Sequence, residues 1–181
     1  STPEMQAFRN FALDITLPVA EGTLAGVVAV VLLAAVAPDG RPVSFSVPTG
    51  NFGNVLAGWV AAQGGLPVDR LVVGSNRNDV LTRWIDSGVM ELQAVEPSLS
   101  PSMDIQVSSN VERYLWELYG RSGSVVAEAM ADLRAHGRLD VGEARMERVR
   151  GTFSGVRVDD DATLAEIARV HAETGVLVDP H

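Results

Sequence analysis

Two β-branched segments separated by a helical stretch constrain the fold of this chain more than any other feature. The first segment is VSFSVP at 43–48, and the second is RLVVGSN at 70–76. The residues between them, from about 54 to 63, have a helical pattern. Units of strand, helix and strand build parallel sheets, because a crossover returns the second strand in the same direction as the first. The sequence therefore predicts an α/β fold.

Further elements extend this pattern toward the C-terminus. NDVLTRWIDSG at 78–88 predicts another helix, and MELQAV at 90–95 is short enough to be another strand. The apolar segment at 23–37 is most simply a helix packed on the sheet, with a strand as the alternative because of its valines. We predict an α/β parallel-sheet core over residues 1–98.

From residue 108 onward the sequence is mainly helical. In SSNVERYLWELYG, Ser109 and Glu112 have the spacing of a capping box on an amphipathic helix. Three more helices are predicted, at about 123–136, 142–153 and 162–174. The mixed charges around 142–168 are typical of a solvated helix face. Residues 99–181 are therefore predicted to form a mainly helical C-terminal part of the same domain.

Charge and composition exclude several classes of function. The net charge of −9 would repel a nucleic-acid backbone or an anionic membrane, and the apolar run at 24–37 is shorter than the roughly 20 residues that span a bilayer. Without cysteine there is neither a disulfide nor a thiolate metal site, which fits a cytoplasmic protein. All 14 basic residues are arginine, so no lysine can form a Schiff base.

The loop that follows the first predicted strand is a candidate anion site. It reads Gly50, Asn51, Phe52, Gly53 and Asn54, and it opens the next helix. Unpaired N–H groups at a helix N-terminus attract anions, and glycine allows the main chain to approach a ligand closely. The G-x-x-G spacing differs from that of dinucleotide-binding loops and P-loops. From the residues alone, either a phosphate monoester site or a plain tight turn is consistent with this loop.

Other polar clusters have simpler interpretations. SNRND at 75–79 follows the second strand and predicts a turn in which Asn78 or Asp79 caps the next helix. The segment 98–110 is either a lid or lining loop, or an ordinary Ser- and Pro-rich connection. His136 and His171 are predicted to be structural or exposed, and the acidic run 159–161 is better explained as helix capping than as a metal site.

Several motifs occur in a specific order along the chain. They are PTGNFGN at 48–54, N-x-N-D at 76–79, SPSMDI-x-x-SSN-x-ER at 100–113 and a terminal DPH. As an ordered set over about 140 residues, from residue 41 onward, they resemble threonine synthase, a pyridoxal-phosphate enzyme of fold type II, in particular its bacterial branch. This resemblance implies a parallel sheet with helices on both faces in three layers, followed by the C-terminal helical layer.

The resemblance also implies a site and a reaction. Gly50, Asn51, Phe52, Gly53 and Asn54 would bind the phosphate group of pyridoxal phosphate, with backbone N–H groups from Gly50 to Gly53 as donors. The reaction of the family converts O-phosphohomoserine and water to threonine and phosphate, with the cofactor as electron sink.

The chain departs from the family at three places. The Schiff-base lysine of the family would precede residue 1, and nothing in this chain replaces it. Residues 1–40 resemble the family weakly, and the chain stops at His181, one residue before the threonine that looks like the partner of the pyridine nitrogen. We therefore expect this chain to be part of a threonine synthase that needs the missing N-terminal portion and is inactive alone. The alternative is a non-catalytic α/β fragment that folds alone and binds anions weakly.

Overall fold

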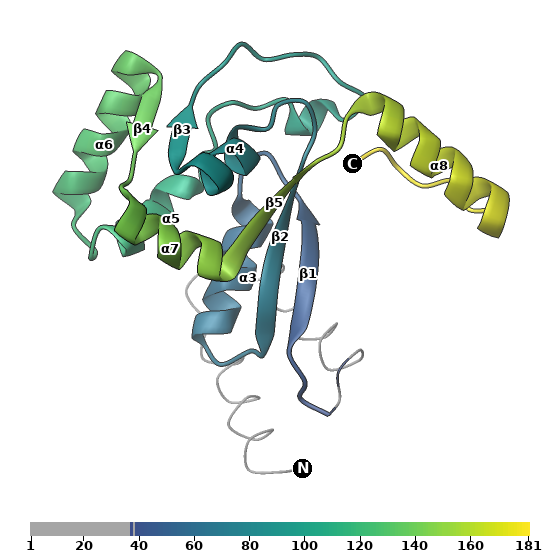
Figure 1. The fold of residues 1–181 in the computed structure, drawn as a ribbon, viewed down its shortest axis with the longest axis horizontal. Coiled ribbons are helices and arrows are strands. Elements are labelled where there is room, and N and C mark those ends of the chain that lie inside the picture. Colours follow the sequence, from purple (N-terminus) through teal and green to yellow (C-terminus); the bar gives the residue numbers. More distant parts are fainter. Residues whose placement is uncertain (1–36, 38) are drawn as a thin grey trace.

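The computed structural model describes residue 37 and residues 39–181, so the apolar segment predicted at 23–37 lies outside the described residues except for its last alanine. Figure 1 shows the described elements around three central strands. In chain order they are β1 (Val43–Pro48), α3 (Gly53–Gln63), β2 (Val68–Ser75), α4 (Val80–Ser87), β3 (Val89–Glu91), a 3-10 turn (Pro101–Met103), α5 (Val111–Leu118), α6 (Gly123–His136), β4 (Arg138–Asp140), α7 (Glu143–Thr152), β5 (Phe153–Arg157) and α8 (Asp160–Thr174).

The main sheet consists of three parallel strands in the order β1-β2-β5. Pro48 lies opposite Gly74, and Arg157 lies opposite Ser75, so the carboxyl ends of all three strands meet at one edge. Ligands of open α/β sheets bind at this kind of edge. The predicted α/β fold with a parallel sheet is confirmed, and β1 spans the predicted residues 43–48.

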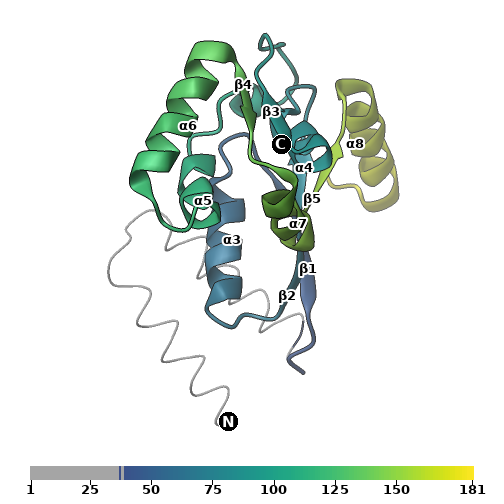
Figure 2. The same cartoon turned by 60° about the vertical axis from the view of Figure 1, so that its left-hand side comes forward.

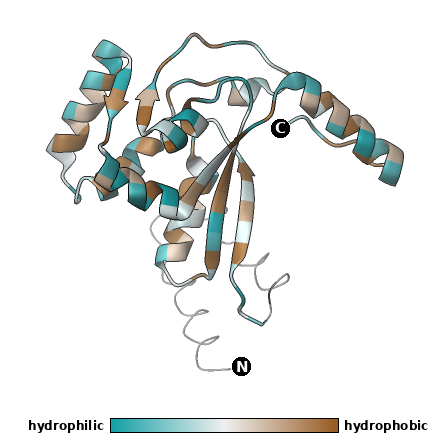
Figure 3. Cartoon of the chain, in the orientation of Figure 1, coloured by the Kyte–Doolittle hydropathy of each residue, from teal (hydrophilic) through white to brown (hydrophobic). Residues whose placement is uncertain are grey.

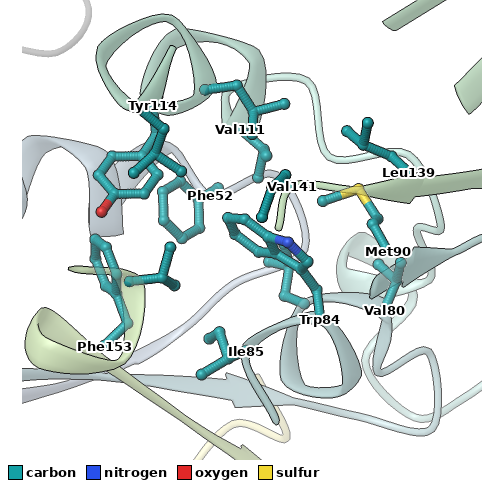
Figure 4. Packing of buried hydrophobic residues seen from close by; sticks show 14 of the residues in the cluster. Phe52, Val80, Trp84, Ile85, Met90, Val111, Tyr114, Leu139, Val141 and Phe153 are labelled. Carbon is teal, nitrogen blue, oxygen red and sulfur yellow. The ribbon is translucent and has the colours of Figure 1, made fainter. Parts of the chain in front are cut away.

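The hydrophobic core lies against one face of this sheet. Leu71 and Val73 of β2 alternate with less buried residues, as expected for a strand with one face on the core. Helices α3, α4 and α5 supply the opposing side chains. Figure 4 shows the result: Trp84 of α4 and Tyr114 of α5 pack near Phe52 in the middle of the cluster. The strands of the sheet and helices α3, α4 and α5 therefore share one hydrophobic core.

Two glycines allow helices to approach the sheet closely. A Cβ atom on Gly155 of β5 would lie 2.8 Å from the Cα atom of Thr82 in α4. A Cβ atom on Gly58 of α3 would lie 3.0 Å from a methyl carbon of Leu71. Carbon atoms pack best at about 3.5–4.0 Å, so a larger residue at 155 would push α4 away from β5, and a larger residue at 58 would displace the side chain of Leu71.

The sequence pattern did not predict β5. Helices α7 and α8 match the predictions at 142–153 and 162–174, but the five residues of β5 lie between them and pair with β2. Phe153–Arg157 directly follows a charged helix and is short. Because its pairing partner lies far earlier in the chain, the strand leaves little local signal in the sequence.

The strand predicted at 90–95 was only partly right. β3 covers Val89–Glu91 and pairs antiparallel with β4, in a separate two-stranded sheet. The residues at 93–97 are exposed and have no regular structure. A strand in the main sheet would need to bury side chains on the core face, and these residues bury none.

The predicted capping box at the start of α5 was wrong. The helix begins at Val111 with Asn110 at the N-cap position, and no side chain accepts a cap hydrogen bond there. The hydroxyl of Ser109 instead lies 3.5 Å from Oδ1 of Asn51, 58 residues earlier in the chain. A tertiary contact has replaced the local one.

Helix α8 projects away from the core. Figures 1 and 2 both place it apart from α3, α5 and α6, and none of its residues is buried. Figure 3 shows apolar residues on it among polar ones, and Leu164 is 53% exposed. The predicted capping by the acidic run is confirmed, because Asp159 Oδ1 accepts a hydrogen bond from the N–H of Ala162 at 3.0 Å. No helix in the described ranges is both long and apolar enough to cross a lipid bilayer.

Candidate functional site

Loop 49–54 connects β1 to α3 at the carboxyl edge of the sheet. The N–H of Thr49 donates to the carbonyl of Gly74 at 3.0 Å, which ties the start of the loop to β2. Helix α3 begins at Gly53, and the first N–H groups of a helix have no partner within it. Among the described residues, no acceptor binds the N–H groups of Gly50, Asn51, Gly53 and Asn54. The loop therefore offers backbone donors at the edge where ligands bind.

Phe52 anchors this loop in the core. Its backbone has φ 62° and ψ 8°, a left-handed conformation that costs a non-glycine residue about 1–3 kcal/mol. The ring is fully buried, 5.4 Å from that of Phe153 and 6.1 Å from that of Tyr114, measured between centroids. Burial also raises the pKa of the Tyr114 hydroxyl to about 12, which keeps the phenol neutral. Burying an aromatic ring offsets the strain, so the side chain of Phe52 belongs to the core.

The peptide unit between Asn51 and Phe52 is held at both ends. The N–H of Phe52 donates to Oγ1 of Thr49 at 2.9 Å. The carbonyl of Asn51 accepts from the N–H of Asn110 at 3.2 Å and from its side-chain Nδ2 at 3.0 Å. Of the five positions predicted for the site, four therefore keep uncommitted N–H groups, whereas that of Phe52 is already bonded.

Thr49 and Asn110 were not predicted from the sequence as residues of this site. Thr49 carries a local signal, since a threonine hydroxyl commonly accepts from an N–H a few residues later in a turn. Asn110 carries none, because it lies 59 residues from its partner in the loop. Its motif was part of the resemblance, but no spacing rule connects it to Asn51.

Loop 75–79 follows β2 at the same edge and is packed with internal hydrogen bonds. Asn78 donates from Nδ2 to the carbonyl of Glu96 at 2.8 Å and accepts the N–H of Glu96 at 2.9 Å through Oδ1. Asn76 and Asn78 both donate to Oδ1 of Asp104, at 2.8 and 2.9 Å. Both asparagines are buried. These amides fasten the loop to the segment after β3 and are no longer available to a ligand.

Asp104 is the acceptor at the centre of this network. Burial alone would raise the pKa of its carboxyl group, but hydrogen bonds from the hydroxyl and N–H of Ser98 and from Asn76 outweigh it, helped by the charge of Arg77. The pKa of Asp104 is therefore held below its ordinary value. The Ser98 hydroxyl bond is 2.6 Å long, as expected for a charge-assisted donor.

The prediction that Asn78 or Asp79 caps α4 was wrong. Asp79 occupies the N-cap position, but no side chain accepts a cap hydrogen bond there. Its carboxylate instead pairs with Arg83 at 2.8 Å and with Arg157 at the end of β5 at 3.6 Å. Asp79 therefore links loop 75–79 to α4 and to the end of β5. Its carboxylate does not cap the helix, because the two arginines compete with the helix N–H groups for it.

Segment 98–110 packs against both loops. Its first half bonds loop 75–79 through Ser98 and Asp104. Its second half lies on loop 49–54, where a Cβ on Gly50 would meet Ile105 at 3.0 Å and the backbone of Met103 at 3.3 Å. Of the two interpretations of this segment, a lining role fits these contacts better than an ordinary connection.

The remaining candidates do not form a catalytic cluster within the described residues. The histidines at 136 and 171 lie on α6 and α8 and are exposed, and the described residues contain no group of three His, Asp or Glu that could hold a metal ion. The sequence contains no lysine. The carboxyl edge thus presents backbone donors, amides and arginines but no side-chain amine.

Comparison with known proteins gives consistent matches. No protein-family model matches the chain. Threonine synthase of Pseudomonas aeruginosa is 48% identical over 141 residues, which are 78% of this chain and 30% of that protein. The crystal structure of pyridoxal-phosphate-bound threonine synthase from Brucella melitensis matches with a TM-score of 0.81 and 43% identity, over 87% of this chain and 34% of that one. The yeast threonine synthase structure matches with a TM-score of 0.75 and 32% identity, over 82% of this chain and 32% of that one.

These matches all name threonine synthases, and they cover similar shares of the two chains. Each covers most of this chain, yet the chain spans only about a third of the proteins that it matches. Sequence and fold point to the same relatives independently of any single motif. The chain is therefore homologous to threonine synthases over about a third of their length.

Proposed function

We propose that loop 49–54 binds the phosphate group of pyridoxal phosphate. The donors are the N–H groups of Gly50, Asn51, Gly53 and Asn54, and the observation that carries the proposal is that these groups have no acceptor among the described residues. The positive end of the α3 dipole adds to the attraction for an anion. Homology to a threonine synthase whose structure contains pyridoxal phosphate supports this choice of ligand.

The residues of this chain fit one end of the cofactor. Four neutral backbone donors at a helix start suit a phosphate group, since among the described residues no carboxylate accepts a hydrogen bond from them. The aldehyde end would need an amine, and no side chain of this sequence carries one. The chain therefore provides a binding function toward the cofactor rather than the group that would hold its aldehyde.

In a complete enzyme this portion would serve threonine synthesis. We propose that it belongs to a carbon–oxygen lyase that converts O-phosphohomoserine and water to threonine and phosphate in the cytoplasm. Bound pyridoxal phosphate would supply an electron sink for carbanions formed on the substrate. A lysine from another portion of the enzyme is required, so this chain alone is expected to form no threonine.

The absence of lysine also favours a second candidate function. A chain with an intact phosphate loop and no side-chain amine can act as a non-catalytic anion-binding module. The two proposals share the loop and differ in the partner, since only the first predicts activity when a lysine-bearing portion of a threonine synthase is added. Restored threonine formation on mixing would favour the enzyme portion over the module.

The loop assignment is tested by titrating the chain with pyridoxine 5′-phosphate, which lacks the aldehyde and cannot react with the N-terminal amine. Backbone amide NMR should show the largest shifts at residues 50–54, inorganic phosphate should compete, and pyridoxine without phosphate should not bind. Equal shifts with pyridoxine would refute a phosphate site.

A matched pair of glycine variants sharpens the test. Gly53→Val would push against the side chain of Asn110, which lies 3.3 Å from the position of the new Cβ. Gly123→Val also changes the first residue of a helix, but a Cβ there has open space. We expect about a tenfold or greater loss of phosphate affinity for the first variant, because the loop must shift, and little change for the second.

A further inference from the structure

The side chain of Asn110 has an unusual hydrogen-bond partner. Asparagine at an N-cap position usually accepts a hydrogen bond from the first turn of its own helix. Here no cap bond forms, and Nδ2 donates across the molecule to the carbonyl of Asn51 at 3.0 Å. The backbone N–H of Asn110 adds a second donor to the same oxygen at 3.2 Å. The residue at the N-cap position of α5 therefore supplies two donors to one carbonyl of loop 49–54.

These contacts fix the orientation of a single peptide unit. The N–H and C=O of a trans peptide point in opposite directions, so Asn110 on the carbonyl of Asn51 and Thr49 on the N–H of Phe52 hold the same plane from both sides. The Asn110 amide also lies against Gly53, at 3.3 Å from the position that a Cβ would occupy. Asn110 thus spans the loop from the fixed peptide to the start of α3.

The orientation of this peptide matters for anion binding. A carbonyl oxygen carries a partial negative charge, and turned toward a bound phosphate it would repel the ligand and displace neighbouring donors. Two donors on the carbonyl of Asn51 keep that oxygen directed at α5. The N–H groups on either side, at Gly50, Asn51, Gly53 and Asn54, remain without an acceptor among the described residues.

We propose that Asn110 is a positioning residue of the phosphate loop, which locks the Asn51–Phe52 peptide so that its carbonyl faces away from the bound anion. The inference rests on the proposed function of loop 49–54. It adds a residue from the segment 98–110 whose side chain acts through the loop backbone and need not touch the ligand.

The test measures the affinity for inorganic phosphate by amide NMR of the 181-residue chain. Asn110→Ala keeps the backbone donor and should weaken phosphate about 3- to 10-fold, the size of one hydrogen bond. Asn110→Asp has the same shape but offers no donor and adds a negative charge, so it should weaken phosphate further, about tenfold or more. Thr49→Val should cause a loss similar to that of Asn110→Ala from the other end, while Thr49→Ser should retain the affinity.

Two controls separate positioning from general stability. Asn78→Ala removes a buried amide from loop 75–79 and should lower the unfolding midpoint without changing phosphate affinity per folded molecule. The double variant Thr49→Val with Asn110→Ala should lose less affinity than the sum of the single losses, because both act on one peptide.

The outcomes distinguish this inference from the function on which it rests. The positioning role would be overturned if Asn110→Ala bound phosphate with wild-type affinity, or if Asn78→Ala lost as much phosphate affinity as Asn110→Ala for the same loss of stability. Either result would leave the loop assignment intact. Absence of phosphate-induced shifts in loop 49–54 of the wild-type chain would overturn the proposed phosphate site itself.

Discussion

Loops 49–54 and 75–79 leave neighbouring parallel strands at the same edge of the sheet, and both are rich in polar residues. The first keeps four backbone N–H groups without an acceptor among the described residues and buries one aromatic ring. The second buries two asparagine side chains and satisfies them through Glu96 and Asp104. A buried polar group without a hydrogen-bond partner is costly, whereas N–H groups at an exposed helix start can stay without a protein acceptor and bind a ligand. Two loops of similar composition at one edge of a sheet can therefore serve different ends, one stability and the other binding.

The largest expected effect tests the anchor of the first loop. Phe52→Ala removes a fully buried ring that contacts the rings of Phe153 and Tyr114, and we expect the free energy of unfolding to fall by about 3–5 kcal/mol. Urea unfolding followed by fluorescence measures it. Trp116→Ala, at an aromatic that is 41% exposed, should cost about 1 kcal/mol or less. Equal costs would mean that the loop is not anchored in the core.

A smaller effect separates the asparagines of the two loops. Asn78→Ala leaves the N–H and the carbonyl of Glu96 without their amide partner and removes one of the donors to Asp104 Oδ1, so the free energy of unfolding should fall by about 1–3 kcal/mol. Asn54→Ala changes an exposed side chain and should alter stability by about 0.5 kcal/mol or less. Thermal unfolding of both variants checks the contrast, and a larger loss for Asn54→Ala would reverse the roles assigned to the loops.

A pH titration of stability, compared between the wild type and Asp104→Asn, probes the second loop. Because the pKa of Asp104 is lowered in the folded state, its ionised form contributes stability above the ordinary pKa of about 3.8, and that contribution is lost as pH falls through the lower folded pKa. We expect the unfolding midpoint to drop in that acidic window, and less steeply in Asp104→Asn. Identical slopes for both proteins would show that Asp104 is not the titrating group.

The smallest effect concerns the link from loop 75–79 to α8. Arg77 pairs with Asp160 at 2.7 Å, with both side chains partly exposed, so Asp160→Asn should cost about 1 kcal/mol or less. Asp161→Asn changes the neighbouring exposed acid of the same helix turn and serves as control. Hydrogen exchange of the α8 amides should be faster in Asp160→Asn only. Unchanged exchange in both variants would show that the Arg77–Asp160 ion pair does not hold α8 in place.

Local elements of this fold were predictable because their signals lie within a few residues. β1, α3 and α6 appear close to their expected bounds, since alternation, helical spacing and glycine boundaries are short-range patterns. The strand β5 and the antiparallel pairing of β3 were not predicted, because pairing partners far apart in sequence leave no such pattern. Both capping predictions failed where another partner took the place of the helix N–H groups: Arg83 and the distant Arg157 at Asp79, and the distant Asn51 at Ser109.

The candidate site divides in the same way. Composition and spacing placed glycines and asparagines of loop 49–54 at the start of a helix, and the absence of lysine follows from the sequence alone. The tertiary structure decides which N–H groups of the loop remain without an acceptor, because Thr49 binds that of Phe52. It also places the ring of Phe52 in the core, against Phe153 and Tyr114. Only the tertiary structure brings Asn110 to the carbonyl of Asn51, because a hydrogen bond across 59 residues is decided by the packing of α5 against the loop.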